Sequence, residues 1–323
     1  MPADARLLLL AKHEVEQLLV PGDVLDAVRE AFVLHSAGEG RVFPVVREAL
    51  PTGGVFGIKS GSIPAQGVLG FKAAGFWPDN RQVGSEPHQA TVMLIDPLTG
   101  RPLCLIDGNA ITTQRTGAAG GLGLLQLARP GSTRLCLFGA GVQAQVQLEF
   151  ALRLMPSLAE VRYLTADGKP NPGFEAKFAG RCRITHTLDA NAAVADSEVV
   201  ITATPGKGPL FDAQAVQPGT HLTCVGADTK GKRELPDGLL ARTRLVVDDL
   251  TQARQIGETQ WAPETPAAEL GDLLTDKVKF TRQPADITVF DMTGLALQDL
   301  TVARLLYARA SAAGLGQSIS WPW

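Results

Sequence analysis

The sequence has few of the residues that mark disulfide-linked, metal-binding or serine-hydrolase proteins. It contains four cysteines in 323 residues, and they are far apart and form no C-x-x-C pair. Three of them lie in apolar runs typical of buried strands, which fits core thiols in a reducing compartment. No His/Cys/Asp cluster has metal-ligand spacing, and no Gly-x-Ser-x-Gly motif indicates a serine nucleophile. We therefore expect neither a metal site nor that nucleophile.

The sequence also lacks a signal for membrane or nucleic-acid binding. The early apolar run at 7–10 is too short for a membrane span, and its flanks do not resemble a signal cleavage region. A net charge of −3 gives no bias toward nucleic acid or anionic lipid, and 45% hydrophobic with 20% charged residues is ordinary for a globular protein. We expect a cytoplasmic protein with a small-molecule partner.

The chain is long enough for about two domains of roughly 150 residues. Residues 23–37 form an amphipathic helix pattern with Asp23 as a plausible N-cap. Short apolar runs cut by Pro/Gly turns follow over 42–77, and two more, at 92–96 and 103–107, flank a proline-led turn. The first hundred residues therefore predict a sheet-rich unit with a helix.

Within the stretch 109–128, Thr112 and Thr113 are expected to precede a helix crowded with small residues. Each glycine costs a helix about 1 kcal/mol relative to alanine, so a compensating close contact with the next domain is expected. Beyond it, apolar strand patterns alternate with helical ones; the strands are 134–138, 161–164, 198–202, 221–225, 244–247 and 287–290. This alternation predicts a Rossmann-type, doubly wound parallel sheet in an α/β protein.

The last helix pattern, 295–313, is long enough to cross back to the first domain. We predict a discontinuous α+β substrate-binding and dimerisation domain, 1–115 plus 295–323. The Rossmann dinucleotide-binding domain would span 116–294.

A glycine turn stands where the first parallel strand should meet its helix. Gly139, Gly141 and Ala144 form G-x-G-x-x-A after the apolar run that ends at Phe138. Gly139 permits the tight turn, Gly141 lets the backbone approach a pyrophosphate, and Ala144 lets the helix pack closely. Alone, the pattern is equally typical of an ordinary strand-to-helix turn. Its place on the first crossover of a parallel sheet favours dinucleotide binding.

Lys72 is unusual on sequence grounds alone. It is the only charged residue between Val68 and Trp77, and a lone lysine in an apolar strand must reach solvent or a buried partner. A strand-edge lysine that extends to solvent is the alternative. The pattern makes Lys72 a candidate site residue.

Several motifs in order resemble the ornithine cyclodeaminase and mu-crystallin family over roughly residues 20–313. The matching stretches are GFK at 70–72, IDPLTG at 95–100, TTQRTGA at 112–118, GAGVQA at 139–144, VGAD at 225–228 with GKREL at 231–235, and TGLALQDL at 293–300. The resemblance implies a homodimer in which a second domain binds NAD(H) or NADP(H). It also implies hydride transfer between the nicotinamide and the α-carbon of an amino or imino acid.

The resemblance selects site residues that position alone does not. It implies that Arg47, Lys72 and Arg115 bind the substrate carboxylate. Without the motif matches, each is typical of a solvated surface charge. Asp228 follows a strand at the ligand-binding edge of the sheet, where a helix N-cap or a loop carboxylate is the structural alternative. The motif favours a catalytic acid at Asp228, and Lys72 is the other predicted catalytic residue. The predicted cofactor contacts are Arg115, Thr116, Gly139, Gly141, Val142, Gln143, Thr165, Asp167, Thr204 and Thr293. His88 is a weaker candidate.

The residue ending the second Rossmann strand chooses between ribose hydroxyl and 2′-phosphate. Asp167 would repel a phosphate and favours NAD(H), while Lys169 leaves NADP(H) open. In the ornithine cyclodeaminases that the chain resembles, an acid shortly before the loop proline can hold the distal amine of the substrate. The stretch 57–64 contains no acid, and Lys59 would repel a distal ammonium, which argues against a cyclodeaminase. We expect reduction of a cyclic or small imino acid such as 1-pyrroline-2-carboxylate or 1-piperideine-2-carboxylate. Ornithine cyclodeaminase, alanine dehydrogenase and a nucleotide-dependent ligand binder like mu-crystallin are the alternatives.

Overall fold

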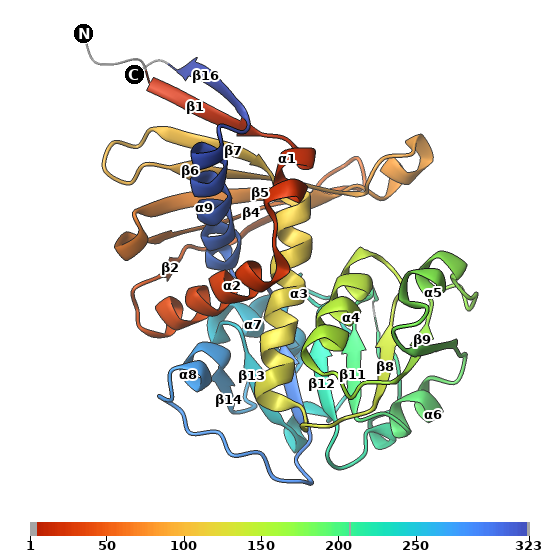
Figure 1. The fold of residues 1–323 in the computed structure, drawn as a ribbon. Helices are drawn as coiled ribbons and strands as arrows, with labels where there is room; N and C mark the ends of the chain where they lie inside the picture. Colours follow the sequence, from red (N-terminus) through yellow and green to blue (C-terminus); the bar gives the residue numbers. More distant parts are fainter. Residues whose placement is uncertain (1–4, 207, 322–323) are drawn as a thin grey trace. The chain divides into compact units, whose positions relative to one another are not determined.

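The computed structural model describes residues 5–206 and 208–321, and the chain divides into two compact units (Figure 1). Unit 1 comprises Met1–Arg115 and Leu295–Trp323, and unit 2 comprises Thr116–Gly294. The helix α3 (Gly108–Leu127) contains the boundary. No helix among the described residues has the length and apolar character needed to cross a bilayer.

Unit 1 is built on a mixed eight-stranded sheet in the order β16-β1-β7-β6-β5-β4-β2, with β3 also paired to β4. All neighbouring strands are antiparallel except β1 and β7, which run parallel. The strands are β1 (Ala5–Leu10), β2 (Arg41–Val42), β3 (Val46–Ala49), β4 (Val55–Ile63), β5 (Val68–Phe76), β6 (His88–Ile95), β7 (Pro102–Asp107) and β16 (Gln317–Trp321).

The helices of unit 1 are α1 (Lys12–Leu18), α2 (Pro21–Ser36) and α9 (Ala296–Ala313). Helix α9 packs on β4, β5 and β6 and against α2 (Figure 1). Glycines make this close approach possible, because a methyl group at Gly61 or Gly70 would lie within about 3 Å of Leu297 or Leu300 of α9. The returning helix therefore completes the core of unit 1.

Unit 2 is a wholly parallel eight-stranded sheet in the order β10-β9-β8-β11-β12-β15-β13-β14. This confirms the doubly wound Rossmann-type prediction. The strands are β8 (Arg134–Phe138), β9 (Glu160–Leu164), β10 (Arg183–His186), β11 (Val199–Thr202), β12 (His221–Cys224), β13 (Arg244–Val247), β14 (Ala267–Glu269) and β15 (Thr288–Asp291). The helices besides α3 are α4 (Val142–Leu154), α5 (Pro172–Phe178), α6 (Ala190–Ala195), α7 (Leu250–Ile256) and α8 (Leu270–Leu274).

Both faces of the parallel sheet are covered, which explains its nearly continuous apolar strands. Leu135 and Leu137 of β8 belong to a core shared with α3, α4 and α5. Cys136 and Phe138 of the same strand belong to a second core shared with α6 and α7. The alternation of strand side chains thus builds two hydrophobic layers from one run of residues.

The small residues of α3 give the close packing that the sequence predicted. A methyl group at Gly117 would approach Phe150 and Val146 of α4 to 2.6 Å, and one at Gly123 would approach Phe290 of β15 to 2.4 Å. Contacts this short are incompatible with a larger side chain. The dispersion gained by this approach offsets the poor helix propensity of glycine.

Two predicted helix starts were wrong. Helix α2 begins at Pro21 with Val20 as N-cap, so Asp23 lies inside the first turn, because proline is pre-organised for the first helical position. Helix α3 begins at Gly108, before Thr112 and Thr113. The side chain of Asp107 caps the first turn of α3, because its carboxylate accepts a hydrogen bond from the Asn109 amide at 3.3 Å.

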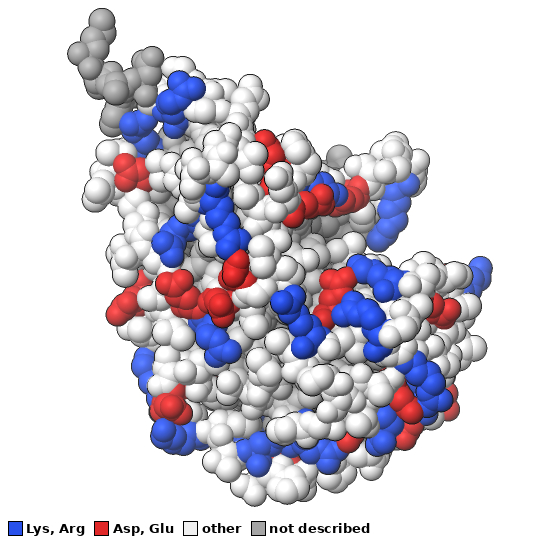
Figure 2. Space-filling view, in the orientation of Figure 1, with Lys and Arg blue, Asp and Glu red and all other residues white. Residues whose placement is uncertain are grey.

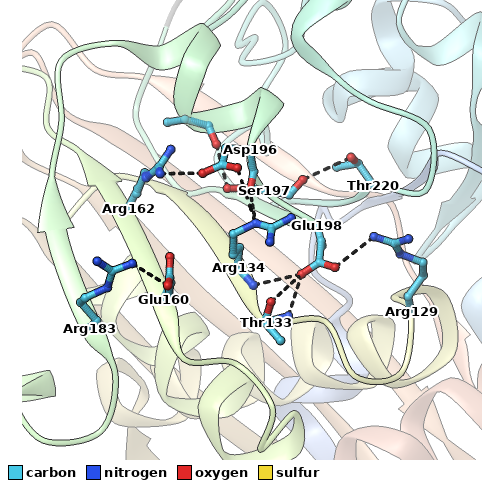
Figure 3. Close-up of polar contacts among 11 residues, drawn as sticks. Arg129, Thr133, Arg134, Glu160, Arg162, Arg183, Asp196, Ser197, Glu198 and Thr220 are labelled. Atoms are coloured by element: carbon cyan, nitrogen blue, oxygen red, sulfur yellow. Dashed lines mark hydrogen bonds and ion pairs between the residues drawn. The ribbon is translucent and has the colours of Figure 1, made fainter.

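The amino ends of the parallel strands carry a network of paired charges (Figure 3). Glu198 accepts hydrogen bonds from the backbone amides of Thr133 and Arg134 at 2.7 and 3.1 Å and from the Arg129 guanidinium at 3.1 Å. Arg183 pairs with Glu160 at 2.5 Å. These charges neutralise one another, and Figure 2 likewise shows acidic and basic side chains interspersed on the face drawn.

Candidate active site

The glycine turn after β8 has the backbone that its sequence predicts. Gly139 has φ of +109°, a region that L side chains rarely adopt, and a methyl group there would lie 2.7 Å from the carbonyl oxygen of Ala203. Ala144 is fully buried and packs with the strand. Gly139 is therefore required by both conformation and space.

The N-terminus of α4 points its first backbone amides to the carboxyl edge of the sheet, without a side-chain cap from Gly141. Gly141 is the N-cap, with no side-chain capping bond and no acid in the first turn. A methyl group at Gly141 would meet no further atom within 4 Å, so the space beside this turn is open. Val142 is 60% exposed. These features fit a dinucleotide pyrophosphate on the amides of this helix.

Asp167 follows β9, the second strand of the nucleotide-binding order. It is fully exposed, and the Lys169 backbone amide, which donates to it at 3.2 Å, is the main cause that lowers the pKa of its carboxyl. The hydroxyl of Thr165 donates to the carbonyl of Lys169 at 2.7 Å and so closes the same turn. An ionised acid at this position can bond a ribose hydroxyl and repels a 2′-phosphate.

Thr204 and Thr293 follow β11 and β15 at the carboxyl edge of the sheet. The hydroxyl of Thr204 donates to Glu234 at 2.8 Å, and that of Thr293 donates to Asp248 at 2.8 Å. Thr116, in α3, accepts a hydrogen bond from Gln147 through its carbonyl at 2.8 Å. Each of these predicted contact residues is therefore held by a buried polar partner in unit 2.

Asp228 lies in the loop after β12. Its carboxylate pairs with the Lys232 ammonium at 2.7 Å and accepts from the Thr229 hydroxyl at 3.1 Å. Both members of the ion pair are about one-third exposed. The position is a loop at the carboxyl edge and not a helix N-cap, so the carboxylate is accessible to a ligand.

Glu234, to which no role was assigned from the sequence, holds the Asp228 loop in place. Its carboxylate accepts hydrogen bonds from the Thr204 amide at 2.7 Å and the Gly226 amide at 2.8 Å. It is fully buried, and burial is the main cause that raises the pKa of its carboxyl. One side chain thus joins the loops after β11 and β12.

Two further buried carboxylates extend this arrangement. Glu258 accepts from the Glu234 amide at 2.6 Å, and Asp291 accepts from the Glu258 and Thr259 amides at 3.0 and 2.8 Å. Burial, with Asp291 nearby, raises the pKa of Glu258 to about 8, and burial raises the pKa of Asp291 to about 7. The loops at the carboxyl edge are therefore organised by carboxylates on backbone amides.

Unit 1 brings together Lys72 and Arg115, which are far apart in sequence. The Lys72 ammonium lies 2.9 Å from each carboxylate oxygen of Asp299, and Arg115 Nε donates to the same carboxylate at 3.1 Å. Arg115 also donates to the Gln298 side-chain oxygen at 3.1 Å. All four residues are buried, at most 6% exposed. Asp299 and Gln298, from α9, were missed by the sequence analysis.

The charges of this cluster shift one another. Burial, together with the positive charges of Arg115 and Lys59, lowers the pKa of Lys72 to about 7, because these effects outweigh the attraction of Asp299. Burial opposes ionisation of Asp299, but Arg115 and Lys72 outweigh it and bring the pKa of Asp299 below its usual value. Lys72 can therefore gain or lose a proton near neutral pH.

Arg47 lies in β3 opposite Gly57 of β4. A methyl group at Gly57 would come within 3.0 Å of the Arg47 side chain, so the missing side chain makes room for the guanidinium stem. Arg47 is half-buried, and its side chain lies over Gly57 of β4. His88, the weaker candidate, has Nδ1 3.1 Å from the Asn109 side-chain oxygen, a contact between β6 and the start of α3.

The parallel sheet and its glycine turn define a dinucleotide-binding protein with a second, sheet-rich unit. The model of the ornithine cyclodeaminase/mu-crystallin family matches residues 6–314, and the chain belongs to this family. The iminosuccinate reductase of Paracoccus denitrificans is 32% identical over 97% of this chain and 99% of that protein.

Two solved structures share the whole fold. An archaeal alanine dehydrogenase dimer with bound NAD is 31% identical, with a TM-score of 0.91 over 98% of this chain and 100% of that one. The Thermococcus litoralis Δ1-pyrroline-2-carboxylate reductase, in complex with NADH and L-proline, is 28% identical, with a TM-score of 0.88 over 97% and 100%. These relatives are named for reductase or dehydrogenase activity, so the family membership supports an enzyme.

Proposed function

We propose that this protein is an NAD(H)-dependent oxidoreductase that reduces the α-carbon of a cyclic or small α-imino acid. The buried pair Lys72 and Arg115, held on Asp299, is the observation that carries the proposal. An α-imino acid needs a bound carboxylate and a protonated nitrogen, and these cations can serve both needs. The iminium acid, NADH and one proton yield the ammonium form of the amino acid and NAD⁺.

Each substrate-binding residue has a distinct part in this proposal. The guanidinium groups of Arg47 and Arg115 bind the α-carboxylate, because their planar forks match its geometry. Lys72 contacts the carboxylate and the nitrogen, and its pKa of about 7 lets it hold or release a proton there. Asp228 is the second proton-transfer group in the proposal, positioned by the loop that Glu234 holds.

NADH supplies the hydride when it is bound. The amides at Gly141, Val142 and Gln143 would hold its pyrophosphate, and Asp167 would bond the ribose hydroxyl. Arg115, Thr116, Gly139, Thr165, Thr204 and Thr293 complete the proposed cofactor contacts. The two relatives with NAD or NADH bound support this choice over NADP(H).

We also propose a homodimer formed through unit 1. Phe71, Met93 and Leu105 lie side by side across β5, β6 and β7, in register with one another. They are half-buried and point away from the face that holds Lys72 and α9. A second copy would bury this apolar row, and the alanine dehydrogenase relative was solved as a dimer.

The test is nucleotide consumption by the purified protein. NADH or NADPH is mixed with 1-pyrroline-2-carboxylate, 1-piperideine-2-carboxylate, or pyruvate with ammonium, and nucleotide absorbance is followed. We expect oxidation of NADH with at least one of these substrates. If neither these imino acids nor imino diacids cause NADH oxidation, the proposal is contradicted. Release of ammonia and formation of proline from ornithine with NAD⁺ would instead support a cyclodeaminase.

A ligand-binding protein without turnover is the second class of function, since the family includes mu-crystallin. The matched pair Asp228→Asn and Asp237→Asn separates the two classes. Asp237, which follows Asp228 in the chain, is an exposed acid that is ion-paired with Arg233. Loss of turnover in Asp228→Asn alone is expected, whereas unchanged binding and turnover would remove the catalytic role of Asp228.

A further inference from the structure

Unit 1 holds a pocket at the C-terminal end of α9, apart from the residues proposed to carry the reaction. The pocket has a volume of about 280 Å³, close to the lower limit of small-ligand pockets, which is about 300 Å³. It lies between the end of α9 and the strands β1 and β16, which pair at the edge of the sheet (Figure 1). Its lining combines apolar walls with one charged side chain and several hydroxyl groups.

Arg6 of β1 supplies the positive charge of this pocket. Its Nε donates to the Ser318 hydroxyl at 2.6 Å and its Nη2 donates to the Ser318 carbonyl at 3.0 Å, so β16 holds one edge of the guanidinium. Within residues 5–206 and 208–321, Arg6 forms no ion pair with an acid. A guanidinium has five N–H donors, so the end formed by Nη1 and Nη2 can still bind a carboxylate.

The end of α9 contributes the opposite polarity. The helix has Gly314 as its C-cap and no basic residue in its last turn. The amides of Gly314 and Leu315 both donate to the Ala310 carbonyl, and no described donor reaches the three carbonyls of 311–313. Ser311 and Gly314 line the pocket, so this helix end borders it. A helix C-terminus carries partial negative charge and attracts a cation.

The remaining walls suit an apolar side chain. Leu8, Leu103 and Leu315 line the pocket and are half-buried. Tyr307 of α9 adds an aromatic ring, and its hydroxyl makes no hydrogen bond with a described residue. A ligand with an apolar side chain would remove this apolar surface from water, which is favourable.

We propose that this pocket binds a free α-amino acid with an apolar side chain, its carboxylate on Arg6 and its ammonium at the C-terminus of α9. A simple carboxylate would pair with Arg6 but would meet the negative end of the helix, and a simple amine would be repelled by Arg6. A zwitterion matches both groups. Lys72, Arg115 and Asp228 take no part in this site, so the inference does not depend on the proposed reaction.

Three probes with one side chain test the ligand class. L-Leucine, 4-methylpentanoate and 3-methylbutylamine share their apolar carbons, but the second lacks the ammonium and the third lacks the carboxylate. Each is titrated calorimetrically into the full-length protein. We expect L-leucine to bind at least tenfold more tightly than either of the others. Failure of L-leucine to bind, or equal affinity for 4-methylpentanoate, would contradict the proposed class.

Arg6→Met and Arg41→Met form the matched pair that locates the binding. Arg41 is an exposed arginine of β2, at the other end of the same sheet. We expect Arg6→Met to bind L-leucine at least tenfold more weakly and Arg41→Met to bind it like the wild type. L-Leucine held only at the active site would bind Arg6→Met with unchanged affinity. That result would overturn the inference and leave the proposed reductase function in place.

A second variant keeps the inference testable if Arg6→Met, which loses the bonds to β16, does not fold. Ser311 is exposed near the end of α9, so we expect Ser311→Glu to melt like the wild type. Its new carboxylate would lie in the same pocket as Arg6 and compete with the ligand for the guanidinium. L-Leucine binding should fall at least tenfold. Wild-type affinity in folded Ser311→Glu would also overturn the inference.

Discussion

The Lys72 ammonium lies 2.9 Å from both carboxylate oxygens of Asp299, although 227 residues separate them in the chain. The pair keeps a buried lysine from losing its proton altogether, since burial alone would lower the pKa of Lys72 still further. Replacing Asp299 therefore tests the state of Lys72 without touching Lys72 itself.

We predict that Asp299→Asn moves a pH limb of activity. Protonated Lys72 binds the substrate carboxylate, so kcat/KM should fall as pH rises through about 7. Removing the carboxylate lowers the pKa of Lys72 further and should shift this limb at least one unit down. At pH 7 a shift of one unit lowers the protonated fraction of Lys72 from about one-half to about one-tenth, which reduces kcat/KM about fivefold.

The measurement is a pH profile of kcat/KM for the wild type, Asp299→Asn and Lys72→Arg. Arginine stays charged throughout this range, so Lys72→Arg should retain residual activity without a limb near pH 7. A limb that stays at the same pH in Asp299→Asn would show that another group is titrating.

The two glycines of the nucleotide turn give a matched pair for separating folding from binding. Gly139→Ala places a side chain at a φ of +109° and 2.7 Å from the Ala203 carbonyl oxygen. We expect this variant to lose about 1–3 kcal/mol of stability and also to lose NADH binding. Gly141→Ala has an ordinary φ of −77° and open space at the Cβ position.

We therefore expect Gly141→Ala to melt like the wild type while its affinity for NADH falls at least tenfold. Fluorescence titration with NADH and thermal melting check both variants. If Gly141→Ala binds NADH with wild-type affinity, the pyrophosphate does not approach this turn.

Glu234 should act on turnover through the Asp228 loop. In Glu234→Gln, an NH2 group that cannot accept a hydrogen bond replaces one carboxylate oxygen, so the bond from the Thr204 amide or from the Gly226 amide is lost. Each buried group left unpaired costs about 1–3 kcal/mol of stability. We expect kcat to fall at least tenfold, with a smaller change in KM. Stopped-flow measurement of NADH oxidation would follow the chemical step directly.

Glu198→Gln at the opposite edge of the same sheet is the control for this variant. Glu198 also accepts from two backbone amides, those of Thr133 and Arg134 (Figure 3). Its replacement should lower the melting temperature while kcat remains near the wild-type value. Equal effects of the two substitutions on kcat would reduce Glu234 to a merely structural residue.

The sequence predicted the elements that depend on local pattern. The apolar runs predicted the parallel strands, and the glycine spacing marked the nucleotide turn, where the φ of Gly139 and its approach to the Ala203 carbonyl require glycine. Lys72 was found because a single charge in an apolar strand is locally conspicuous. These signals are all contained within about ten residues.

Asp299 and Glu234 were missed because their roles arise from distant partners. Asp299 bonds Lys72 and Arg115, and Glu234 joins loops that follow two different strands. A local signal did exist for Asp299, which is an acid among the apolar residues of a buried helical turn. For Glu234 the motif was recognised, but only the fold shows which amides its carboxylate accepts from.

The proposed dimer gives a prediction about the uncovered side of the unit 1 sheet. Met93 lies between Phe71 and Leu105 in register, at the centre of the apolar row. Met93→Lys would bring a charge into a self-complementary interface, where two copies of the lysine would approach each other. Sedimentation velocity should show a dimer for the wild type and a weakened one for Met93→Lys, with dissociation at least tenfold greater. Leu98→Lys, in the turn between β6 and β7 and 92% exposed, should leave the dimer intact, and a monomeric wild type would refute the proposed assembly.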